Sequence, residues 1–278
     1  FQAEDGIRGY IGDWSSDVCS SDLDLLNKSI NLNLFVYALL VALFLQVGVN
    51  YANDYSDGIK GTDKNRIGPT RLVASGLADA KSVKRAALIC FLLAAIFGTL
   101  ISVTTSYWFL LVGALSILAA WGYTGGKKPY GYFGLGELFV FIFFGVVATT
   151  GSYLIQTMSL SWFSIFISFP VGFLACALLA INNLRDLNTD AKSGKKTLAV
   201  RLGENRAKDF YLYLLGFAHF TAALIAPITL ILGIRTMQMI KDLRSKDYQT
   251  KLIALLADTA RLQMLFGVII SVTIFLAK

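Results

Sequence analysis

Two short stretches of this largely apolar chain each contain a pair of aspartates whose spacing suits metal binding. One stretch, NDYSDGIKGTD, contains Asp54 and Asp57, and the other, NNLRDLNTDAKSGKKT, contains Asp186 and Asp190. Residues three or four positions apart share one face of a helix. Two such pairs at helix ends on one side of a membrane can converge, and converging carboxylates repel one another unless a cation lies between them.

Magnesium fits this pattern because it takes oxygen ligands and commonly joins one or two carboxylates to a substrate phosphate. Asn53 and either Asn182 or Asn183 could add amide oxygens. A solvated loop is the commoner explanation for a single aspartate pair, but two matched pairs favour a metal site. The basic residues nearby suit the remaining charge of a phosphate; they are Lys64, Arg66, Arg71, Arg185, Lys195, Lys196 and Arg201.

The composition predicts an integral membrane protein. Hydrophobic residues make up 55% of the chain and charged residues only 15%, which is too little charge to cover a soluble domain. The apolar residues form long blocks, and a spanning helix needs roughly 20 such residues. We therefore expect an all-α transmembrane bundle with spans at residues 30–50, 85–104, 106–123, 135–156, 162–183, 208–233 and 259–277.

The connections between these blocks differ in charge. Residues 104–106 and 157–161 carry no charge, whereas the longer connections are basic, at residues 51–84, 124–134, 184–207 and 234–258. The positive-inside rule places the basic connections, and with them both acidic motifs, on the cytoplasmic side of the inner membrane. Because the net charge of +7 arises in these connections, we expect no nucleic-acid partner.

The segment at residues 208–233 breaks the alternation of sides. If it crossed the membrane once, the basic residues at 234–258 would lie outside. Two complete crossings need about 40 residues, which is more than this segment contains. We therefore expect the chain to turn back near Pro227, unless sequence has been lost there.

The first 23 residues, FQAEDGIRGYIGDWSSDVCSSDL, do not match the rest of the chain. They are polar and aperiodic, and they lack the basic start and apolar core of a signal peptide. They resemble translated sequencing-adapter DNA, so we expect residues 1–23 to be a non-native segment that makes few contacts with the bundle. Residues 24–278 are then expected to form a single transmembrane domain.

Three longer motifs are similar to those of the UbiA superfamily of intramembrane prenyltransferases, and most similar to its branch that acts on 1,4-dihydroxy-2-naphthoate. They are NDYSDGIKGTDKNRIGPTRLVASG at residues 53–76, YTGGKKPYGYFGLGE at 123–137 and NNLRDLNTDAKSGKKTLAVRLGE at 182–204. The resemblance covers about residues 24–278. It implies nine helices around a cavity open towards the lipid, and Mg²⁺ bridging a polyprenyl diphosphate. The family's first helix is missing here, which leaves the activity of this chain open.

The resemblance also assigns roles to individual residues. Asp54 matches a supporting carboxylate, and we group it with the catalytic residues. In the wider family, the last aspartate of the first motif lies nearer to Asp57, at the position that Gly61 occupies here. In this chain the corresponding aspartate is Asp63, and the naphthoate branch has the same spacing. The metal ligands implied by both motifs are Asn53, Asp57, Asp63, Asp186 and Asp190.

The glycine-rich stretch at residues 123–137 admits two interpretations. The pair Gly125-Gly126 is typical of a simple turn. The resemblance favours a flexible cap over the site, with Tyr123 near the reacting carbon and Lys127 or Lys128 on the diphosphate. We therefore take Asp54, Tyr123 and Lys128 as the candidate catalytic residues.

Two further ionisable residues have simpler explanations. Glu137 begins an apolar helix, where the helix dipole favours an acid. His219 is the single histidine and lies in an apolar segment, so we expect it to be a hydrogen-bonded helix residue.

The expected function is Mg²⁺-dependent transfer of a polyprenyl group from polyprenyl diphosphate to 1,4-dihydroxy-2-naphthoate, giving demethylmenaquinone. The first alternative is a UbiA-type enzyme with another acceptor, namely 4-hydroxybenzoate, homogentisate or a tetrapyrrole. A transporter would need ionisable residues near the centre of the membrane. Apart from His219, the predicted spans carry none there, so a transporter is less favoured.

Overall fold

The computed structural model describes residues 30–62 and 70–276, and within these residues the protein is helical without strands. Residues 1–23 therefore lie outside the described part, as does the expectation that they contact the bundle little. The helices are α2 (Leu32–Lys60), α3 (Ala80–Thr104), α4 (Trp108–Gly122), η1 (Tyr130–Phe133), α5 (Gly136–Val140), η2 (Phe141–Val147), α6 (Ala148–Thr157), α7 (Trp162–Arg185), α8 (Leu187–Lys192), α9 (Leu198–Leu202), α10 (Glu204–Ile225), η3 (Pro227–Leu232), α11 (Gly233–Arg244) and α12 (Tyr248–Leu276).

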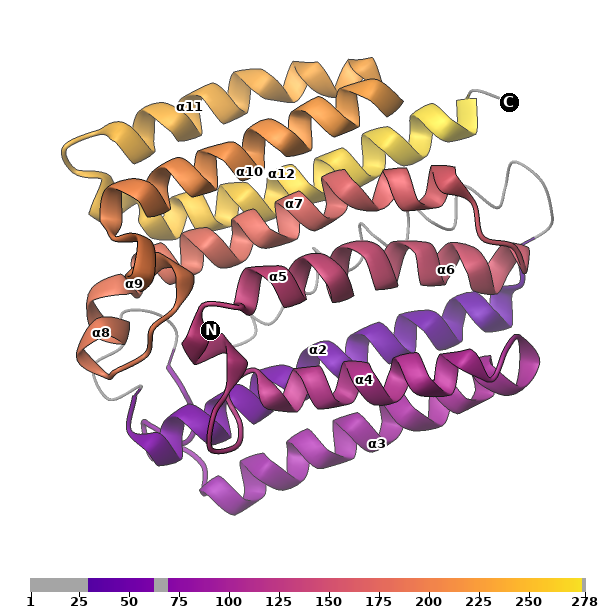
Figure 1. The fold of residues 1–278 in the computed structure, drawn as a ribbon, viewed down its shortest axis with the longest axis horizontal. Helices are drawn as coiled ribbons and strands as arrows, with labels where there is room; N and C mark the ends of the chain where they lie inside the picture. Colours follow the sequence, from indigo (N-terminus) through magenta and orange to yellow (C-terminus); the bar gives the residue numbers. More distant parts are fainter. Residues whose placement is uncertain (1–29, 63–69, 277–278) are drawn as a thin grey trace.

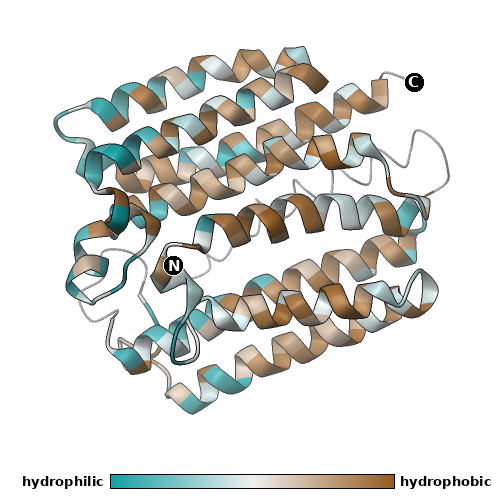
Figure 2. Cartoon of the chain, viewed as in Figure 1, coloured by the Kyte–Doolittle hydropathy of each residue, from teal (hydrophilic) through white to brown (hydrophobic). Residues whose placement is uncertain are grey.

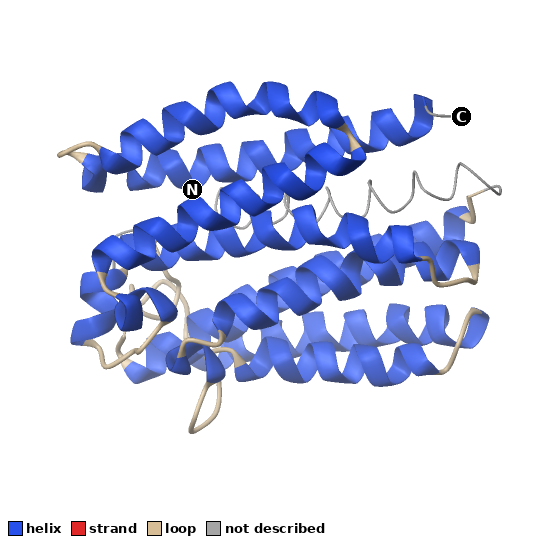
Figure 3. Cartoon of the chain, turned by 45° about the horizontal axis from the view of Figure 1, so that its top comes forward, coloured by secondary structure: helices blue, strands red, loops and turns tan. Residues whose placement is uncertain are grey.

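The long helices lie side by side and run back and forth between two ends of the molecule (Figure 1). α2 packs mainly on α3, whereas α7 packs against α10, α12 and η2. The short helices α8 and α9 gather at one end, on the left of Figure 1, with the C-terminal end of α2 and the connection between α4 and α5. A second view shows the same arrangement (Figure 3). Both acidic motifs therefore lie at one end of the bundle.

Five of the described helical segments are long and apolar enough to cross a membrane by length and composition. They are Leu32–Lys60, Ala80–Thr104, Gly136–Thr157, Trp162–Arg185 and Tyr248–Leu276. Apolar residues cover most of the length of these helices, and hydrophilic residues collect at the end that carries the acidic motifs (Figure 2). Large apolar side chains such as Leu92 and Leu118 are exposed on the outside, as expected for a surface that faces lipid.

The segment Gly136–Thr157 approaches α7 very closely at a pair of glycines. A Cβ atom at Gly145 would lie 2.6 Å from the Cα atom of Gly172, so a larger residue at position 145 would push the two helices apart. Gly145 lies in η2, a stretch of π-helix between α5 and α6. A π-helical insertion inside an α-helix often accompanies a functional site.

The first acidic motif is helical, which corrects the expectation that a connection begins at residue 51. α2 continues to Lys60, so Asp54 and Asp57 lie in its last turns, and Gly61 ends the helix in the left-handed conformation. The charges led the sequence prediction to stop the span too early. In the folded protein these aspartates are buried and hydrogen-bonded, so the helix can continue past them without exposing them to water.

The predicted reversal near Pro227 is present, but the returning segment is longer than expected. α10 runs away from the acidic end, η3 turns, and α11 leads back beside α10 (Figure 1). α11 lies entirely in the segment that we predicted to be a basic loop, at residues 234–258, apart from its first residue.

The terminal helix also begins earlier than predicted, at Tyr248. It therefore contains Asp258, which pairs with Arg235 at 2.5 Å and with Arg261 at 3.2 Å. Asp258 is thus an ionisable residue within α12 that the predicted span, which began at residue 259, left out. His219 itself behaves as expected, because its Nε2 atom shares a 2.7 Å hydrogen bond with Thr236 Oγ1.

Candidate functional site

A cavity of about 910 Å³ opens among α2, α4, α6, α7 and α12, and its wall changes from polar to apolar along its length. Residues of both acidic motifs line the polar part: Asn53, Asp54, Asp57, Asn182, Asn183, Asp186 and Asp190. Small and apolar side chains line the remainder, including Ala38, Val41, Ala42, Val112 and Gly113. Ala38 lies about 28 Å from Asp57 along α2 at the ordinary rise of 1.5 Å per residue. The cavity can therefore hold an anionic head and a long apolar chain.

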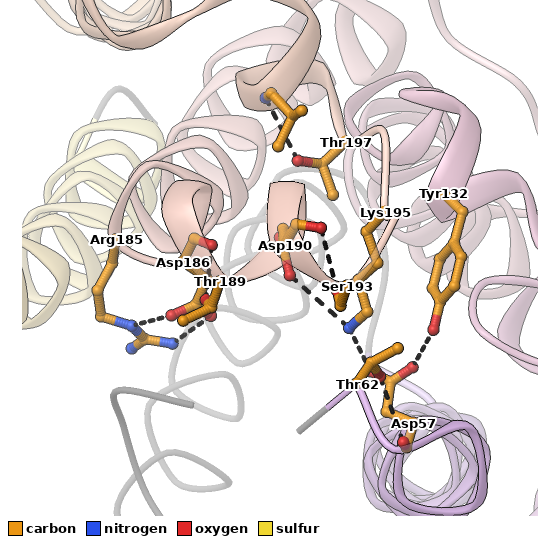
Figure 4. A network of polar contacts seen from close by, with 11 residues as sticks. Asp57, Thr62, Tyr132, Arg185, Asp186, Thr189, Asp190, Ser193, Lys195 and Thr197 are labelled. Atoms are coloured by element: carbon orange, nitrogen blue, oxygen red, sulfur yellow. Dashed lines mark hydrogen bonds and ion pairs between the residues drawn. The ribbon is translucent and has the colours of Figure 1, made fainter. Parts of the chain in front are cut away.

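The ammonium group of Lys195 joins the two acidic motifs. Its Nζ atom lies 2.8 Å from Asp57 Oδ2 and 3.8 Å from Asp190 Oδ1 (Figure 4). All three residues are more than 90% buried. Asp57 and Asp190 were predicted to share one site, and the structure brings them together across the bundle.

Asp186 has a different partner. It lies between α7 and α8 and accepts two hydrogen bonds of 2.8 Å from the guanidinium group of Arg185. Figure 4 shows this pair on the far side of Asp190 from Asp57. The backbone keeps the helical link, because Asp190 N donates to Asp186 O, while the ion pairs seen among the described residues join Asp186 to Arg185 and Asp190 to Lys195. Within the described residues, no three acidic, histidine or cysteine side chains converge on a single point.

Asn53 and Asp54 are held by neighbouring backbone and side chains. Asn53 Oδ1 accepts a 2.7 Å hydrogen bond from Thr124 Oγ1. The two oxygens of Asp54 accept hydrogen bonds from Leu72 N at 2.9 Å and Val73 N at 3.1 Å. This geometry favours the supporting role of Asp54 over a direct role in chemistry, because both oxygens already fix the turn that follows the first motif.

The connection between α4 and α5 covers the polar end of the cavity with tyrosines. Tyr123, Tyr130 and Tyr132 all line the cavity. Burial raises the pKa of Tyr123 well above its ordinary value, and the nearby Glu137 raises it further, so the phenol stays protonated. Burial also raises the pKa of Tyr130. Lys128 is exposed and does not line the cavity, so the structure does not support it as a catalytic residue.

The predicted diphosphate-binding residues fall into three groups. Arg71 and Lys195 line the cavity. Arg185 is buried against Asp186, and Lys196 is exposed, so neither forms part of the cavity wall. Lys64, Arg66 and the predicted metal ligand Asp63 lie outside the described residues.

Tyr132 was not predicted as a site residue, but its phenol donates a 2.6 Å hydrogen bond to Asp57 Oδ1. From the same stretch, Tyr123 and Lys128 were predicted to be catalytic. Glu137 lies in the first turn of α5, as expected, and it also has a hydrogen-bond partner on α7. Glu137 is 5% exposed, and its Oε1 atom accepts a 2.9 Å hydrogen bond from Asn183 Nδ2, at the cavity wall. The glycine-rich pattern signals a cap, but no local pattern shows which tyrosine reaches Asp57.

The oxygen donors of this end of the cavity fit a divalent metal. Asp57 and Asp190 already contact one cationic atom, so their carboxylates can bind the same charge from two helices. Asn53 and Asp186 line the same part of the cavity. Carboxylate and amide oxygens are the ligands that Mg²⁺ prefers.

Comparison with known proteins agrees with this geometry. Residues 26–275 match the UbiA prenyltransferase family. The chain belongs to this family. The 1,4-dihydroxy-2-naphthoate octaprenyltransferase of Mycobacterium tuberculosis is 42% identical over 240 residues, which cover 84% of this chain and 82% of that protein. The enzyme of the same description from Escherichia coli is 43% identical over 185 residues, which cover 64% of this chain and 60% of that protein.

The UbiA fold is also shared with a solved structure. A UbiA homologue from Archaeoglobus fulgidus, bound to GPP and Mg²⁺, superposes with a TM-score of 0.65 over 96% of this chain and 99% of that chain. The two sequences are 14% identical, so this likeness concerns the fold. It confirms the predicted all-helical UbiA-type architecture.

Proposed function

We propose that this UbiA-family protein is a prenyltransferase that transfers a polyprenyl group from polyprenyl diphosphate to 1,4-dihydroxy-2-naphthoate. The observation that carries the proposal is the joining of Asp57, Lys195 and Asp190 at the polar end of a long apolar cavity. A polyprenyl diphosphate has the matching chemistry, because its diphosphate needs cations and its chain needs an apolar channel. The match to the 1,4-dihydroxy-2-naphthoate octaprenyltransferase of Mycobacterium tuberculosis, over 84% of this chain, favours this acceptor.

The residues at the polar end bind and orient the diphosphate. Lys195 and Arg71 line this part of the cavity and supply positive charge for the phosphate oxygens. Asp57 and Asp190 would hold Mg²⁺, with Asn53 and Asp186 beside them. Bound Mg²⁺ would neutralise the charge that develops on the leaving diphosphate.

The reaction breaks the allylic carbon–oxygen bond, and the electron pair leaves with the diphosphate. Lys195 and Arg71 stabilise that charge as it develops. The electron-rich ring of the naphthoate attacks the allylic carbon and forms the new carbon–carbon bond. The ring then loses its carboxylate as carbon dioxide, and the electron pair of the broken bond restores the aromatic ring. The product is the reduced form of demethylmenaquinone.

Aromatic side chains protect the allylic cation from water. Tyr123, Tyr130 and Phe139 line the cavity beside the acidic motifs, and Tyr130 stacks on Phe139 with their ring centroids 4.0 Å apart. The faces of aromatic rings attract cations. Because burial keeps the Tyr123 and Tyr130 phenols protonated, they do not supply a nucleophile that would capture the cation.

We also infer that the enzyme lies in the inner membrane with the acidic motifs facing the cytoplasm, and the apolar outer surface and the basic end of the bundle support this orientation. This orientation also suits substrate supply, because a diphosphate does not cross a bilayer without help.

Membranes that contain the chain provide the test. We expect a labelled polyprenyl diphosphate to react with 1,4-dihydroxy-2-naphthoate in the presence of Mg²⁺, and Asp57→Asn or Asp190→Asn to remove most of the product. Preferential labelling of 4-hydroxybenzoate, homogentisate or a tetrapyrrole would replace the proposed acceptor. Product formation that survives both substitutions would contradict the assigned site.

A further inference from the structure

Two buried carboxylates from distant parts of the chain share one lysine, and this contact defines a link between the acidic motifs. Lys195 Nζ lies 2.8 Å from Asp57 Oδ2 on α2 and 3.8 Å from Asp190 Oδ1 on α8. Without a cation between them, these two negative charges would repel one another in a site of low dielectric constant. The lysine therefore supports the contact between the two halves of the site.

The backbone holds Lys195 in place from both sides. Its own N–H donates to Asp190 O at 3.0 Å, across a turn in which Gly194 has a φ of +80°. The next N–H, of Lys196, donates to Tyr132 O at 3.1 Å. The position of the lysine thus depends on the turn after α8 and on the cap between α4 and α5.

The cap also places an aromatic ring, that of Tyr132, beside the ammonium group of the lysine. Lys195 Nζ lies 5.2 Å from the centroid of the Tyr132 ring, and the phenol of the same tyrosine donates to Asp57 at 2.6 Å. The tyrosine therefore contacts both members of the Asp57–Lys195 pair, as Figure 4 shows. An ammonium group on a flexible stem can leave such a position and keep its charge within the site.

The lysine lies where a divalent cation would have to bind. Its ammonium contacts Asp57 Oδ2 and approaches Asp190 Oδ1, and these oxygens belong to the two carboxylates that the proposed function assigns to Mg²⁺. A metal ion that binds both carboxylates must therefore move the ammonium aside or tolerate its repulsion. The nearest use for a displaced ammonium is the diphosphate, because Lys195 already lines the cavity.

We propose that Lys195 is an exchangeable counter-cation, which joins Asp57 to Asp190 until a divalent metal arrives and then moves to the diphosphate. The inference rests on the proposed function, because it names one residue's part in loading that site. It predicts two effects of opposite sign. Loss of the lysine strengthens binding of the metal alone, but weakens binding of the prenyl diphosphate that follows. A lysine that only bound diphosphate would not affect the metal.

The experiment measures Mn²⁺ binding to the purified chain in detergent, by the loss of the electron paramagnetic resonance signal of free Mn²⁺. We expect Lys195→Met to tighten Mn²⁺ binding about tenfold, because it removes a like charge only a few ångströms from the metal. With Mn²⁺ saturating, the same substitution should weaken binding of a non-reactive prenyl thiodiphosphate about tenfold. Without metal, it should lower the melting temperature by several degrees, because the two carboxylates lose the positive charge between them.

Lys192→Met is the matched control. Lys192 ends α8 two residues after Asp190 and is exposed, so this substitution removes the same charge from the protein surface. It should leave Mn²⁺ affinity unchanged. Lys195→Arg gives a second, independent variant in case Lys195→Met does not fold. A guanidinium group binds carboxylates through two parallel hydrogen bonds and is harder to displace than an ammonium group is. Lys195→Arg should therefore weaken Mn²⁺ binding.

The outcomes separate this inference from the proposed function. Unchanged or weaker Mn²⁺ binding by Lys195→Met, or unchanged binding by Lys195→Arg, would overturn the exchange and leave the prenyl transfer standing. A wild-type chain that binds no Mn²⁺ would overturn the exchange together with the assigned metal site. Absence of prenyl transfer with normal Mn²⁺ binding would overturn the proposed function alone.

Discussion

Tyr132 donates a 2.6 Å hydrogen bond from its phenol to Asp57 Oδ1, and so ties the cap between α4 and α5 to the end of α2. The bond reaches one oxygen of a carboxylate whose other oxygen contacts Lys195. A second lysine, Lys60, lies 4.9 Å from the centroid of the Tyr132 ring. Tyr132 therefore fixes the orientation of Asp57 from the cap side of the cavity wall.

Tyr132→Phe should lower kcat/KM for the prenyl diphosphate by about 10- to 100-fold, because a hydrogen bond to a charged group contributes about 1.5–3 kcal/mol. The Mg²⁺ concentration for half-maximal rate should rise as well, since Asp57 loses its fixed orientation. Tyr107→Phe is the control, because Tyr107 is exposed at the start of α4, at the other end of the bundle. Wild-type Mg²⁺ dependence in Tyr132→Phe would show that Tyr132 does not position Asp57.

The sequence predicted the chemistry of the site better than its internal contacts. Asp57 and Asp190 were assigned to one site from their spacing and from the side of the membrane on which the helices end. Both properties depend on the order of the helices along the chain, and the folded structure keeps them. The partner of Asp186 was not predictable in this way. Arg185 precedes Asp186 directly, and whether such neighbours pair or point apart depends on the bend between α7 and α8.

Span boundaries failed where charges are paired inside the fold. Asp54 in α2 and Asp258 in α12 were predicted to lie outside the membrane because they are charged. In the structure, Asp54 accepts hydrogen bonds from two backbone N–H groups, and Asp258 forms ion pairs with two arginines. Hydropathy counts such residues as solvated, and only the tertiary structure supplies their partners. The reversal near Pro227 was predictable because it follows from the sidedness of basic segments and from length alone.

Glu137 and Asn183 should be energetically coupled. Asn183 Nδ2 donates to Glu137 Oε1 at 2.9 Å, and both residues are buried. Glu137→Ala leaves the amide without this acceptor, which should cost about 1–3 kcal/mol in the free energy of unfolding. The double variant with Asn183→Ala should cost less than the sum of the single variants, by about 0.5–3 kcal/mol.

Glu137→Gln serves as the control for this pair, because it keeps an oxygen acceptor at the same position. It should recover most of the stability lost in Glu137→Ala. Additive single and double variants, measured by chemical unfolding in mixed detergent micelles, would contradict the coupling.

Asp79 should give the protein a pH-dependent stability. Its carboxylate caps α3 by accepting from Lys81 N and Ser82 N, and these hydrogen bonds hold its pKa below the ordinary carboxyl value. Because the pKa is lower in the folded state, the cap contributes fully above the ordinary value and is lost as the pH falls through the folded-state value. The melting temperature of Asp79→Ala should therefore lie below that of the wild type at neutral pH, with the gap closing in acid.

Asp79→Asn separates the charge of the cap from its hydrogen bonds. Asparagine also caps helices, so this variant should melt close to the wild type, with a small gap that disappears as the wild-type carboxyl is protonated. A gap between wild type and Asp79→Ala that stays constant from neutral pH into acid would show that Asp79 does not cap as a carboxylate.

The turn of the chain after α10 leads to a prediction about topology. The connections that contain Ser193 and Ser245 lie at the acidic end of the bundle, whereas those that contain Ser159 and Ile228 lie at the opposite end (Figure 1). The acidic end carries the basic segments, which favour the cytoplasm. Single cysteines at these four positions, with Cys19, Cys90 and Cys176 replaced, report the side of each connection.

An impermeant maleimide applied to intact cells should label Ser159→Cys and Ile228→Cys. Ser193→Cys and Ser245→Cys should label only after the cells are permeabilised. The reverse pattern would overturn the orientation. Labelling of Ser245→Cys but not Ser193→Cys would show that the chain crosses only once between them, so that α10 and α11 do not form the returning pair.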